Sequence, residues 1–365
     1  MWPQRNSGVP ILERQESAPA NQTADWEAIR LFLEVARRGS FRAAADALGV
    51  SINTLRRQID ELEQQLAVKL LTRHVDGVRT TAEGENILDV AKRMESASFG
   101  IVRARDRTLP ALAGEVKLAV TEGLGTFWIA PRLVELQRAH PGLVVNLMCA
   151  MQSADVLRLE ADVAIQLIKP TTPDMKVVKL GRLHSMLFAA RSYIETYGVP
   201  KNVQDMVNHR VVLQLAEQTK TRKLFDDVFA GIPWSGFVSM INNTSTAHSW
   251  AIAKGAGIGA VPTYIHAIGG RFVPIDIDVH FPFDIWLTYH PDAGRIPRVR
   301  RMIEWIIEAF DPRKFPWFRD EFIHPNDLMK SYRGEPLVNL FEGFIHADEA
   351  SASATDKHHG GSPQR

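Results

Sequence analysis

The chain has 365 residues, of which 45% are hydrophobic and 23% are charged, and its formal net charge at pH 7 is +1. This length allows two or three domains, each with its own core. The balanced charge excludes binding to nucleic acid through bulk positive charge, so any affinity for phosphate must come from a local cluster of Arg and Lys. The single cysteine, Cys149, excludes an internal disulfide framework and fits a reducing compartment.

Targeting signals are missing from the sequence. No apolar run approaches the roughly 20 residues that a membrane helix needs. The segment 1–24 is rich in Pro, Gln, Asn and Ser and has no apolar block, so it does not resemble a signal peptide. We therefore expect a cytoplasmic protein without membrane contact and with a disordered arm at 1–24.

Apolar residues recur at helical spacing in three successive segments, the first of which begins at Trp26. Gly39 should end the first helix, and Ser40 should cap the second. Gly49 then provides a tight turn, and Ser51 caps the third helix. The inward face of this third helix consists of Ile52, Leu55, Ile59, Leu62 and Leu66. Three helices with a glycine turn between the last two form a helix-turn-helix.

The opposite face of the third helix is polar near its N-terminus, where side chains can reach base edges and phosphates in a major groove. The alternative is a solvated face that binds nothing. The segment 70–81 predicts two short strands around Asp76-Gly77, a strong hairpin signal that would place a wing after the helices. From Arg37 to Arg79 there are eight Arg or Lys against five Asp or Glu. The predicted DNA-contacting residues are Ser40, Arg42, Ser51, Ile52, Asn53, Thr54, Arg56, Arg57, Arg73 and Arg79.

Several motifs carry a resemblance to a known family. They are Phe32-Leu33-Glu34-Val35-Ala36, Gly39-Ser40-Phe41-Arg42-Ala43-Ala44-Ala45, Leu48-Gly49-Val50-Ser51, Leu71-Thr72-Arg73 and Thr81-Ala82-Glu83-Gly84. With them, residues 25–84 resemble the DNA-binding domain of the LysR-type transcriptional regulators. The resemblance implies a winged helix-turn-helix at 25–82 that binds double-stranded DNA. The chain departs from the family pattern where Ile52-Asn53 replaces the usual Gln-Pro and Arg56 replaces the usual Ser, so the family's operator preferences should not be transferred.

The segment 83–110 predicts one long helix with a heptad seam. The seam residues are Ile87, Val90, Met94, Ala97, Ile101 and Ala104. An amphipathic helix lying on its own domain is the alternative. The resemblance implies a linker helix that forms a homodimer, which would present two recognition helices to two half-sites. The sequence leaves open whether dimers pair into a homotetramer, and RNA polymerase is a further candidate partner.

From residue 111 to 310, strand-like and helical runs alternate, which predicts an α/β domain with a mainly parallel sheet. The resemblance continues through Gly114–Thr121, His140-Pro141-Gly142, Ala161–Ile165 and Ala253–Pro262. It implies a two-lobed effector domain with the periplasmic-binding-protein fold. We expect lobe I at 114–189 and 262–310, and lobe II at 190–261.

Ligands of such sheets lie beyond the carboxyl ends of strands, near helix N-termini. Three loops are therefore predicted to form an effector site, which consists of Thr121, Glu122, Gly123, Gln166, Asn243, Thr244 and Ser245. Hydroxyls and backbone amides there could hold a carboxylate or another anion. Glu122 would repel an anion if it faced the cleft. The threonines could also be plain helix caps.

Catalytic and cofactor motifs are not convincing. The glycines of Gly255–Gly259 end a helix and open a strand, which is the reverse of a dinucleotide loop. The sequence has no Gly-x-Ser-x-Gly elbow and no His-Glu-x-x-His, and His358-His359 lacks partners at metal-ligand spacing. We expect no enzymatic activity, no cofactor and no metal. The competing hypothesis is a solute-binding or enzymatic α/β protein whose helix-turn-helix does not bind DNA.

The C-terminal segment 311–345 extends beyond the usual end of the family's chains and is rich in aromatic residues. Because so many aromatic side chains would not remain solvated, we predict that this extension packs against the effector domain or a second subunit. Residues 346–365 should be disordered.

Overall fold

The computed structural model describes residues 24–107, 112–150, 155–172, 174–216, 219, 221–229, 234–334 and 337. They belong to two compact units, one within residues 1–98 and the other within 99–365. The predicted disorder of the arm 1–24, apart from Ala24, and of the tail 346–365 concerns residues outside the described ones. No helix in the described ranges is long and apolar enough to cross a membrane.

The first unit begins with α1 (Trp26–Arg38), α2 (Phe41–Leu48) and α3 (Ile52–Leu66). Each helix starts at a side-chain cap: Asp25 accepts from the Glu27 amide, Ser40 from that of Ala43 and Ser51 from that of Thr54. Gly39 and Gly49 follow α1 and α2 with φ of 61° and 67°, a left-handed conformation that favours glycine. The predicted helix boundaries are therefore confirmed.

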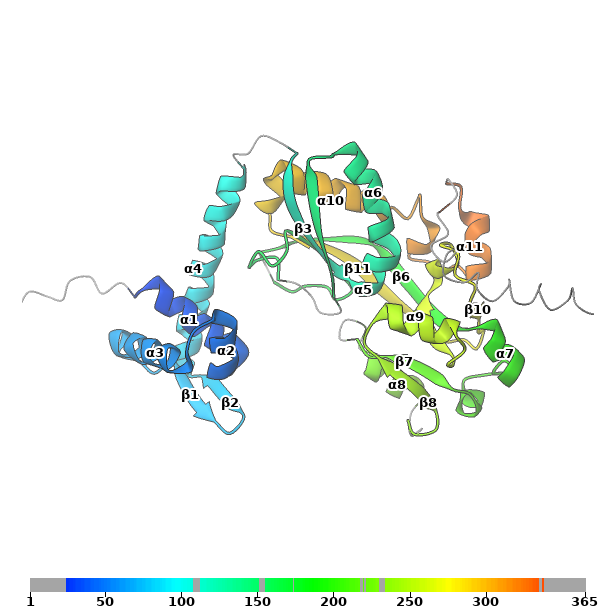
Figure 1. Ribbon diagram of the computed structural model, residues 1–365, viewed down its shortest axis with the longest axis horizontal. Helices are drawn as coiled ribbons and strands as arrows, with labels where there is room; N and C mark the ends of the chain where they lie inside the picture. The colour runs from blue at the N-terminus through cyan, green and yellow to red at the C-terminus, as the bar shows by residue number, and fades with distance from the viewer. Residues whose placement is uncertain are drawn as a thin grey trace, which may run out of the picture. The chain divides into compact units, whose positions relative to one another are not determined.

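A buried apolar cluster holds these helices together. Its members include Phe32 of α1, Ala44 and Ala45 of α2, and Leu55, Ile59 and Leu62 of α3. The small side chains of α2 allow neighbouring helices to pack closely. The hairpin β1 (Leu71–His74) and β2 (Gly77–Thr80) follows, and α4 (Ala82–Arg107) leads out of the unit (Figure 1).

The hairpin turn differs from the prediction by one residue. His74 pairs with Gly77, so Val75 and Asp76 form the turn and Gly77 begins β2. Gly77 has φ of 134°, and a Cβ there would collide with the Gly39 carbonyl oxygen. The neighbouring Val78 amide donates to that same oxygen at 2.7 Å. The glycine therefore serves a close approach between the hairpin and the end of α1, rather than the turn itself.

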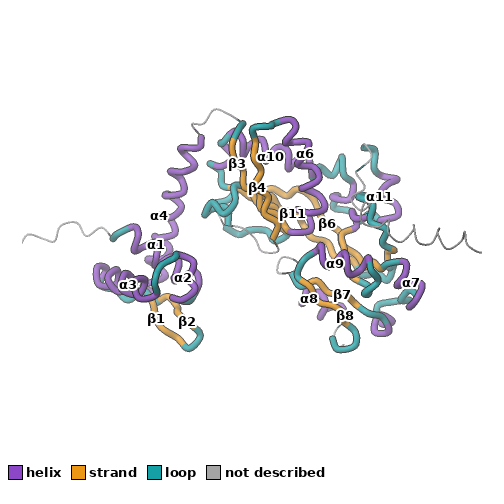
Figure 2. Tube along the Cα trace, in the orientation of Figure 1, coloured by secondary structure: helices purple, strands orange, loops and turns teal. Residues whose placement is uncertain are grey.

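The second unit is built on a mixed sheet (Figure 2). Its described strands are β3 (Gly114–Thr121), β4 (Leu143–Ala150), β5 (Val163–Gln166), β6 (Lys176–Ala189), β9 (Gly259–Pro262), β10 (Val273–Pro274) and β11 (His280–Tyr289). They follow the order β10-β6-β11-β5-β3-β4, with β9 also paired to β6. Parallel pairing joins β4, β3 and β5, whereas the pairs of β6 and β11 are antiparallel. The prediction of a mainly parallel sheet is wrong, because two long strands run in opposite directions through its middle.

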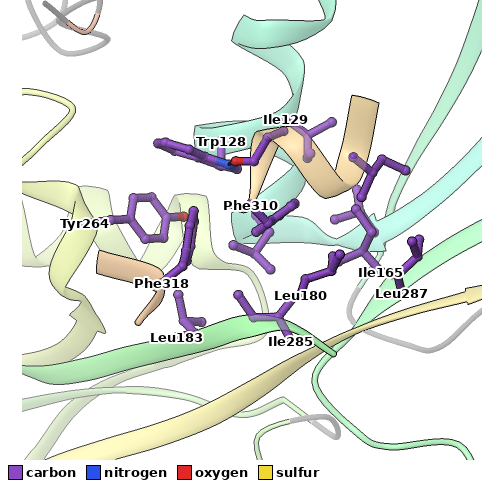
Figure 3. Close-up of a cluster of buried hydrophobic side chains, with 14 of the residues drawn as sticks. Trp128, Ile129, Ile165, Leu180, Leu183, Tyr264, Ile285, Leu287, Phe310 and Phe318 are labelled. Carbon is purple, nitrogen blue, oxygen red and sulfur yellow. Dashed lines mark hydrogen bonds between the residues drawn. The ribbon is translucent and has the colours of Figure 1, made fainter. Parts of the chain in front are cut away.

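The helices that pack on this sheet come from several segments of the chain. They are α5 (Glu122–Leu124), which continues through a π-helical turn at Gly125–Ile129 into α6 (Ala130–Ala139), and α10 (Pro297–Ala309). The single-turn 3₁₀ helices of the unit lie at Gln204–Asn208, Thr263–Ile265, Ala293–Arg295 and Pro316–Phe318. The larger apolar cluster lies between these helices and the sheet, with Trp128, Ile165, Ile285 and Leu287 among its buried members (Figure 3).

A smaller lobe surrounds a second sheet of β7 (Val211–Gln214) and β8 (Val238–Asn242), which pair in parallel. Its helices are α7 (Arg191–Tyr197), α8 (Thr221–Val228) and α9 (Ser245–Ala253). A separate apolar cluster fills this lobe, with Tyr193, Phe225 and Ile258 at its centre. Ile275, Ile277 and Val279 also belong to this cluster, although the sequence prediction assigns everything after Pro262 to the first lobe.

The C-terminal extension packs into the larger core. Trp317 and Phe318, and Leu328 of α11 (Pro325–Ser331), are buried there. Trp317 and Phe318 make edge-to-face contacts with Trp128, whose indole N–H donates to the Ala309 carbonyl at 2.9 Å. The prediction that the aromatic extension packs against the effector domain is confirmed for the described part of 311–345.

Candidate DNA-binding surface and effector pocket

The N-terminal half of α3 presents a polar surface to solvent. Asn53, Arg56 and Arg57 are exposed, and Thr54 is half-buried. Ile52 is half-buried too, and it packs against the apolar cluster of the unit. Arg57 lies 3.6 Å from Glu61 and both side chains are well exposed, so this pair is worth little and can be exchanged for a contact with phosphate.

The beginning of α2 lies against this surface. Arg42 is exposed, whereas the Ser40 hydroxyl accepts from the Ala43 amide at 3.4 Å. The Arg56 guanidinium lies 5.6 Å from the centre of the Phe41 ring, so α2 partly orients it. Ser51 contacts Thr54 through both the Thr54 amide and hydroxyl, at 3.0 and 2.8 Å. The two serines therefore shape the helix starts, and the arginines provide the exposed charge.

The wing arginines do not share a face of the hairpin. Arg79 is opposite Thr72 in the ladder, and Arg73 is opposite Val78. Residues paired in this way lie on the same face, and successive residues alternate between faces. Arg73 and Arg79 therefore extend from opposite faces, and both are exposed. Arg79 also approaches Asp76 of the turn at 3.6 Å.

Glu63 connects the recognition helix to the wing, a role that the sequence analysis missed. Its buried carboxylate accepts from the amides of Leu70 and Leu71 at 2.8 and 3.2 Å, and from the Lys69 ammonium. Burial acts to raise the pKa of Glu63, but these hydrogen bonds outweigh it and lower the pKa below its usual value. A carboxylate at the last turns of α3 thus fixes the start of β1. No local signal distinguishes it from the solvated glutamates of the same helix.

The helix α4 divides its apolar residues between two sides. Ile87 and Ala91 pack on the cluster of the first unit. The remaining seam residues are exposed, with Val90 at 47% and Ile101 at 73%. Exposure of this size is unusual for large aliphatic side chains along one helix face, and it indicates a surface for association.

A cavity of about 140 Å³ lies between the two lobes. Of the predicted effector residues, Thr121, Gly123 and Ser245 line it, whereas Glu122, Gln166, Asn243 and Thr244 are not among its lining residues. Gln166 is buried beside Trp286 in the sheet, and Thr244 caps α9 by accepting from the Ala247 amide. Much of the lining is apolar and was not predicted, including Leu183, Leu187, Val212, Leu213, Phe225 and Phe283. Their sequence pattern is that of ordinary core residues.

Glu122 lies at the junction of the lobes. Its carboxylate accepts from the backbone amides of Ser245 and Thr246 at 2.6 and 3.2 Å, and from the Thr246 hydroxyl. The amides that the sequence analysis offered to a ligand are therefore already bonded to a carboxylate of the chain itself.

The chain matches two family models. Residues 26–85 match the bacterial regulatory helix-turn-helix protein, lysR family, and residues 110–311 match the LysR substrate binding domain. The chain therefore belongs to the LysR family of transcriptional regulators. It is a LysR-type DNA-binding transcription regulator with an effector-binding domain.

The following relatives share less than a third of the aligned residues with this chain. The chain is 31% identical over 196 residues to an HTH-type transcriptional regulator of Xanthomonas campestris, a match covering 52% of this chain and 55% of that protein. It is 25% identical to the HTH-type transcriptional regulator DmlR of Escherichia coli, over 77% of this chain and 93% of that protein. The full-length structure of the Vibrio cholerae virulence activator AphB aligns with a TM-score of 0.47 and 17% identity, over 78% of this chain and 99% of that one.

Proposed function

We propose that the exposed N-terminal face of α3 enters the major groove of double-stranded DNA, with Asn53, Arg56 and Arg57 facing the bases or phosphates. The arrangement of exposed arginines on a helix held by caps and a buried core supports this assignment. Arg42 and the wing arginines Arg73 and Arg79 would contact the backbone on either side. Ser40 and Ser51 would position these helix starts, with their neighbouring amides near phosphate.

Electrostatics provides the test. Arg57→Ala should weaken binding to the duplex that flanks the chain's own coding region by roughly tenfold or more, and a phosphate contact would also reduce the salt dependence by about one ion. Fluorescence anisotropy between 50 and 200 mM salt measures both. Lys92→Ala is the matched control, because Lys92 is an exposed cation on α4. Equal affinities for the two variants would contradict the assignment.

We propose further that the exposed seam of α4 joins two copies of the chain into a homodimer. Val90→Glu would place a charge within this seam and should yield monomers in sedimentation velocity. Lys92→Glu introduces the same side chain away from the seam and should remain dimeric. A dimeric Val90→Glu variant would refute the role of the seam.

The cavity between the lobes is proposed as the place where a small-molecule effector binds and changes the affinity for DNA. Two observations favour this role. The cavity lies between two lobes, and Thr121, Gly123 and Ser245 are among the residues that line it. We propose that the protein acts in the cytoplasm, where the DNA is, and regulates transcription without catalysing a reaction. The naming of its relatives as transcriptional regulators supports this.

A further inference from the structure

The N-terminus of α9 is an anion site that the chain fills itself. The first amides of a helix have no partner within the helix and carry a partial positive charge, so they attract anions. Here the amides of Ser245 and Thr246 and the Thr246 hydroxyl all donate to the Glu122 carboxylate. Glu122 begins α5 in the larger lobe, whereas α9 contacts β7 of the smaller one. This contact therefore spans the junction of the lobes.

The two lobes meet too closely at this point for a second anion. The residue after Glu122 is Gly123, and a Cβ there would lie 2.7 Å from the Ser245 hydroxyl oxygen. The Tyr264 hydroxyl also donates to the Gly123 carbonyl at 3.3 Å. A ligand carboxylate would have to displace Glu122 before reaching the amides of α9.

The described residues that line the adjoining cavity offer a charged ligand no counter-charge. Among the described residues that line it there is no Asp, Glu, Lys or Arg. The polar side chains that line it include Thr121, Ser185, Gln214 and Ser245, which are uncharged. His248 is buried with its Nε2 3.0 Å from the Ala260 carbonyl, so that nitrogen carries the proton and donates. Burial lowers the pKa of His248 to about 4, and the ring is neutral at pH 7.

Desolvation then decides which ligands fit. Moving a charged group from water into an apolar site without a counter-charge is more unfavourable than the remaining contacts of a small ligand can offset. An uncharged apolar molecule meets no such cost and gains from burial against the leucine and phenylalanine side chains. The volume of about 140 Å³ is similar to that of an apolar cavity known to admit benzene.

We propose that this cavity binds an uncharged, largely apolar molecule about the size of one aromatic ring, and that Glu122 excludes carboxylate ligands by occupying the anion position at α9. The proposal rests on the proposed function in taking the cavity as the effector site. It departs from the sequence expectation that these amides are open to an anionic effector.

The first experiment uses the wild-type full-length chain and ring compounds of similar size. Toluene, benzyl alcohol and benzamide are uncharged, whereas benzoate is an anion and benzylammonium a cation. We expect calorimetric titration to show saturable binding of at least one uncharged compound, at least tenfold tighter than that of either ion. Tighter binding of benzoate, or no binding of any uncharged compound up to its solubility limit, would overturn the proposal.

The second experiment empties the anion position. In Glu122→Ala, acetate should bind at the start of α9 and raise the Tm in a saturable way. The wild type and the control Glu195→Ala, which removes an exposed carboxylate of α7, should respond equally and weakly. An identical acetate response in all three proteins would overturn the role of Glu122. If Glu122→Ala does not fold, the comparison of benzamide with benzoate on the wild type still decides the ligand class.

The two levels of the hypothesis fail separately. Wild-type protein that binds duplex DNA but none of the uncharged compounds refutes the ligand class and leaves the regulator intact. Wild-type protein that binds no duplex refutes the proposed function, whichever ring compound it binds.

Discussion

Replacing Phe318 by Ala tests whether the C-terminal extension is part of the effector-domain core. The Phe318 side chain is 0% exposed, and its ring lies 5.0, 4.9 and 6.1 Å from those of Trp128, Phe310 and Tyr264. Figure 3 shows it between Tyr264 and Phe310. On the other side, a Cβ at Gly181 of β6 would lie 2.6 Å from the Phe318 carbonyl oxygen, so the sheet fits closely against the extension.

These contacts set the expected magnitude. Losing the buried ring removes about 2–3 kcal/mol of transfer free energy. The cavity left behind adds a further cost, because rings on several sides cannot collapse into it, and the total for Phe→Ala in such sites is about 3–5 kcal/mol. We expect Phe318→Ala to lower the free energy of unfolding by about 4 kcal/mol.

The extension itself provides the control. Phe322 is 40% exposed, so Phe322→Ala should cost no more than about 1.5 kcal/mol. Urea unfolding followed by tryptophan fluorescence measures both, since Trp128 and Trp317 lie in the core concerned. The transition of this domain must be analysed apart from that of the DNA-binding unit, because two units need not unfold together. Equal costs for the two variants would refute the view that the extension completes the core.

Three further changes test other contacts. Glu63→Gln should destabilise the DNA-binding unit by roughly 1–3 kcal/mol, because a neutral side chain satisfies the Leu70 and Leu71 amides less well. Folding lowers the pKa of Glu63 from its usual value of 4.5, so the wild type should lose this stabilisation as the pH falls below 4.5. Urea titrations at several pH values should show this loss for the wild type and not for the variant. Gly77→Ala should lower both the Tm and the affinity for DNA, because its Cβ collides with the Gly39 carbonyl; an unchanged Tm would refute the contact. Because the pKa of His248 falls from 6.5 to about 4 on folding, the unfolded chain takes up a proton that the native chain does not. His248 should therefore contribute about 2 kcal/mol to the drop in the free energy of unfolding between pH 7 and pH 5, and His248→Gln should show a drop smaller by that amount in urea titrations at the two pH values.

The sequence predicted the DNA-binding unit well because its signals are local. Ser40, Gly49 and Ser51 act on the backbone within a few residues, so their type and spacing are enough to place the helix ends. The displaced hairpin turn shows the limit of such reasoning. Gly77 looked like a turn residue, but its role depends on Gly39, which lies close in space and far in sequence.

The sheet of the second unit shows a second limit of prediction from sequence. Alternation of strands and helices predicts their order but not the direction in which strands pair. The long strand β6 is buried over much of its length, so its apolar run resembles that of a parallel core strand. Its antiparallel pairing with β11 joins residues about 100 positions apart, and no pattern within either segment specifies it.

The predicted effector site shows the same contrast between local and long-range signals. The hydroxyls and amides of Thr244-Ser245-Thr246 predicted a place for a carboxylate, and the structure does place one on the amides of Ser245 and Thr246. That carboxylate belongs to Glu122, a residue 123 positions earlier that was predicted to lie in the effector site and to repel an anion if it faced the cleft. The local sequence thus predicted that the start of α9 binds a carboxylate. It could not predict that this carboxylate comes from Glu122 of the chain itself, because that contact joins the two lobes. This contact satisfies the polar groups at the start of α9, and the described residues that line the adjoining cavity are uncharged and largely apolar. The proposed selectivity of the cavity for uncharged molecules rests on these two observations.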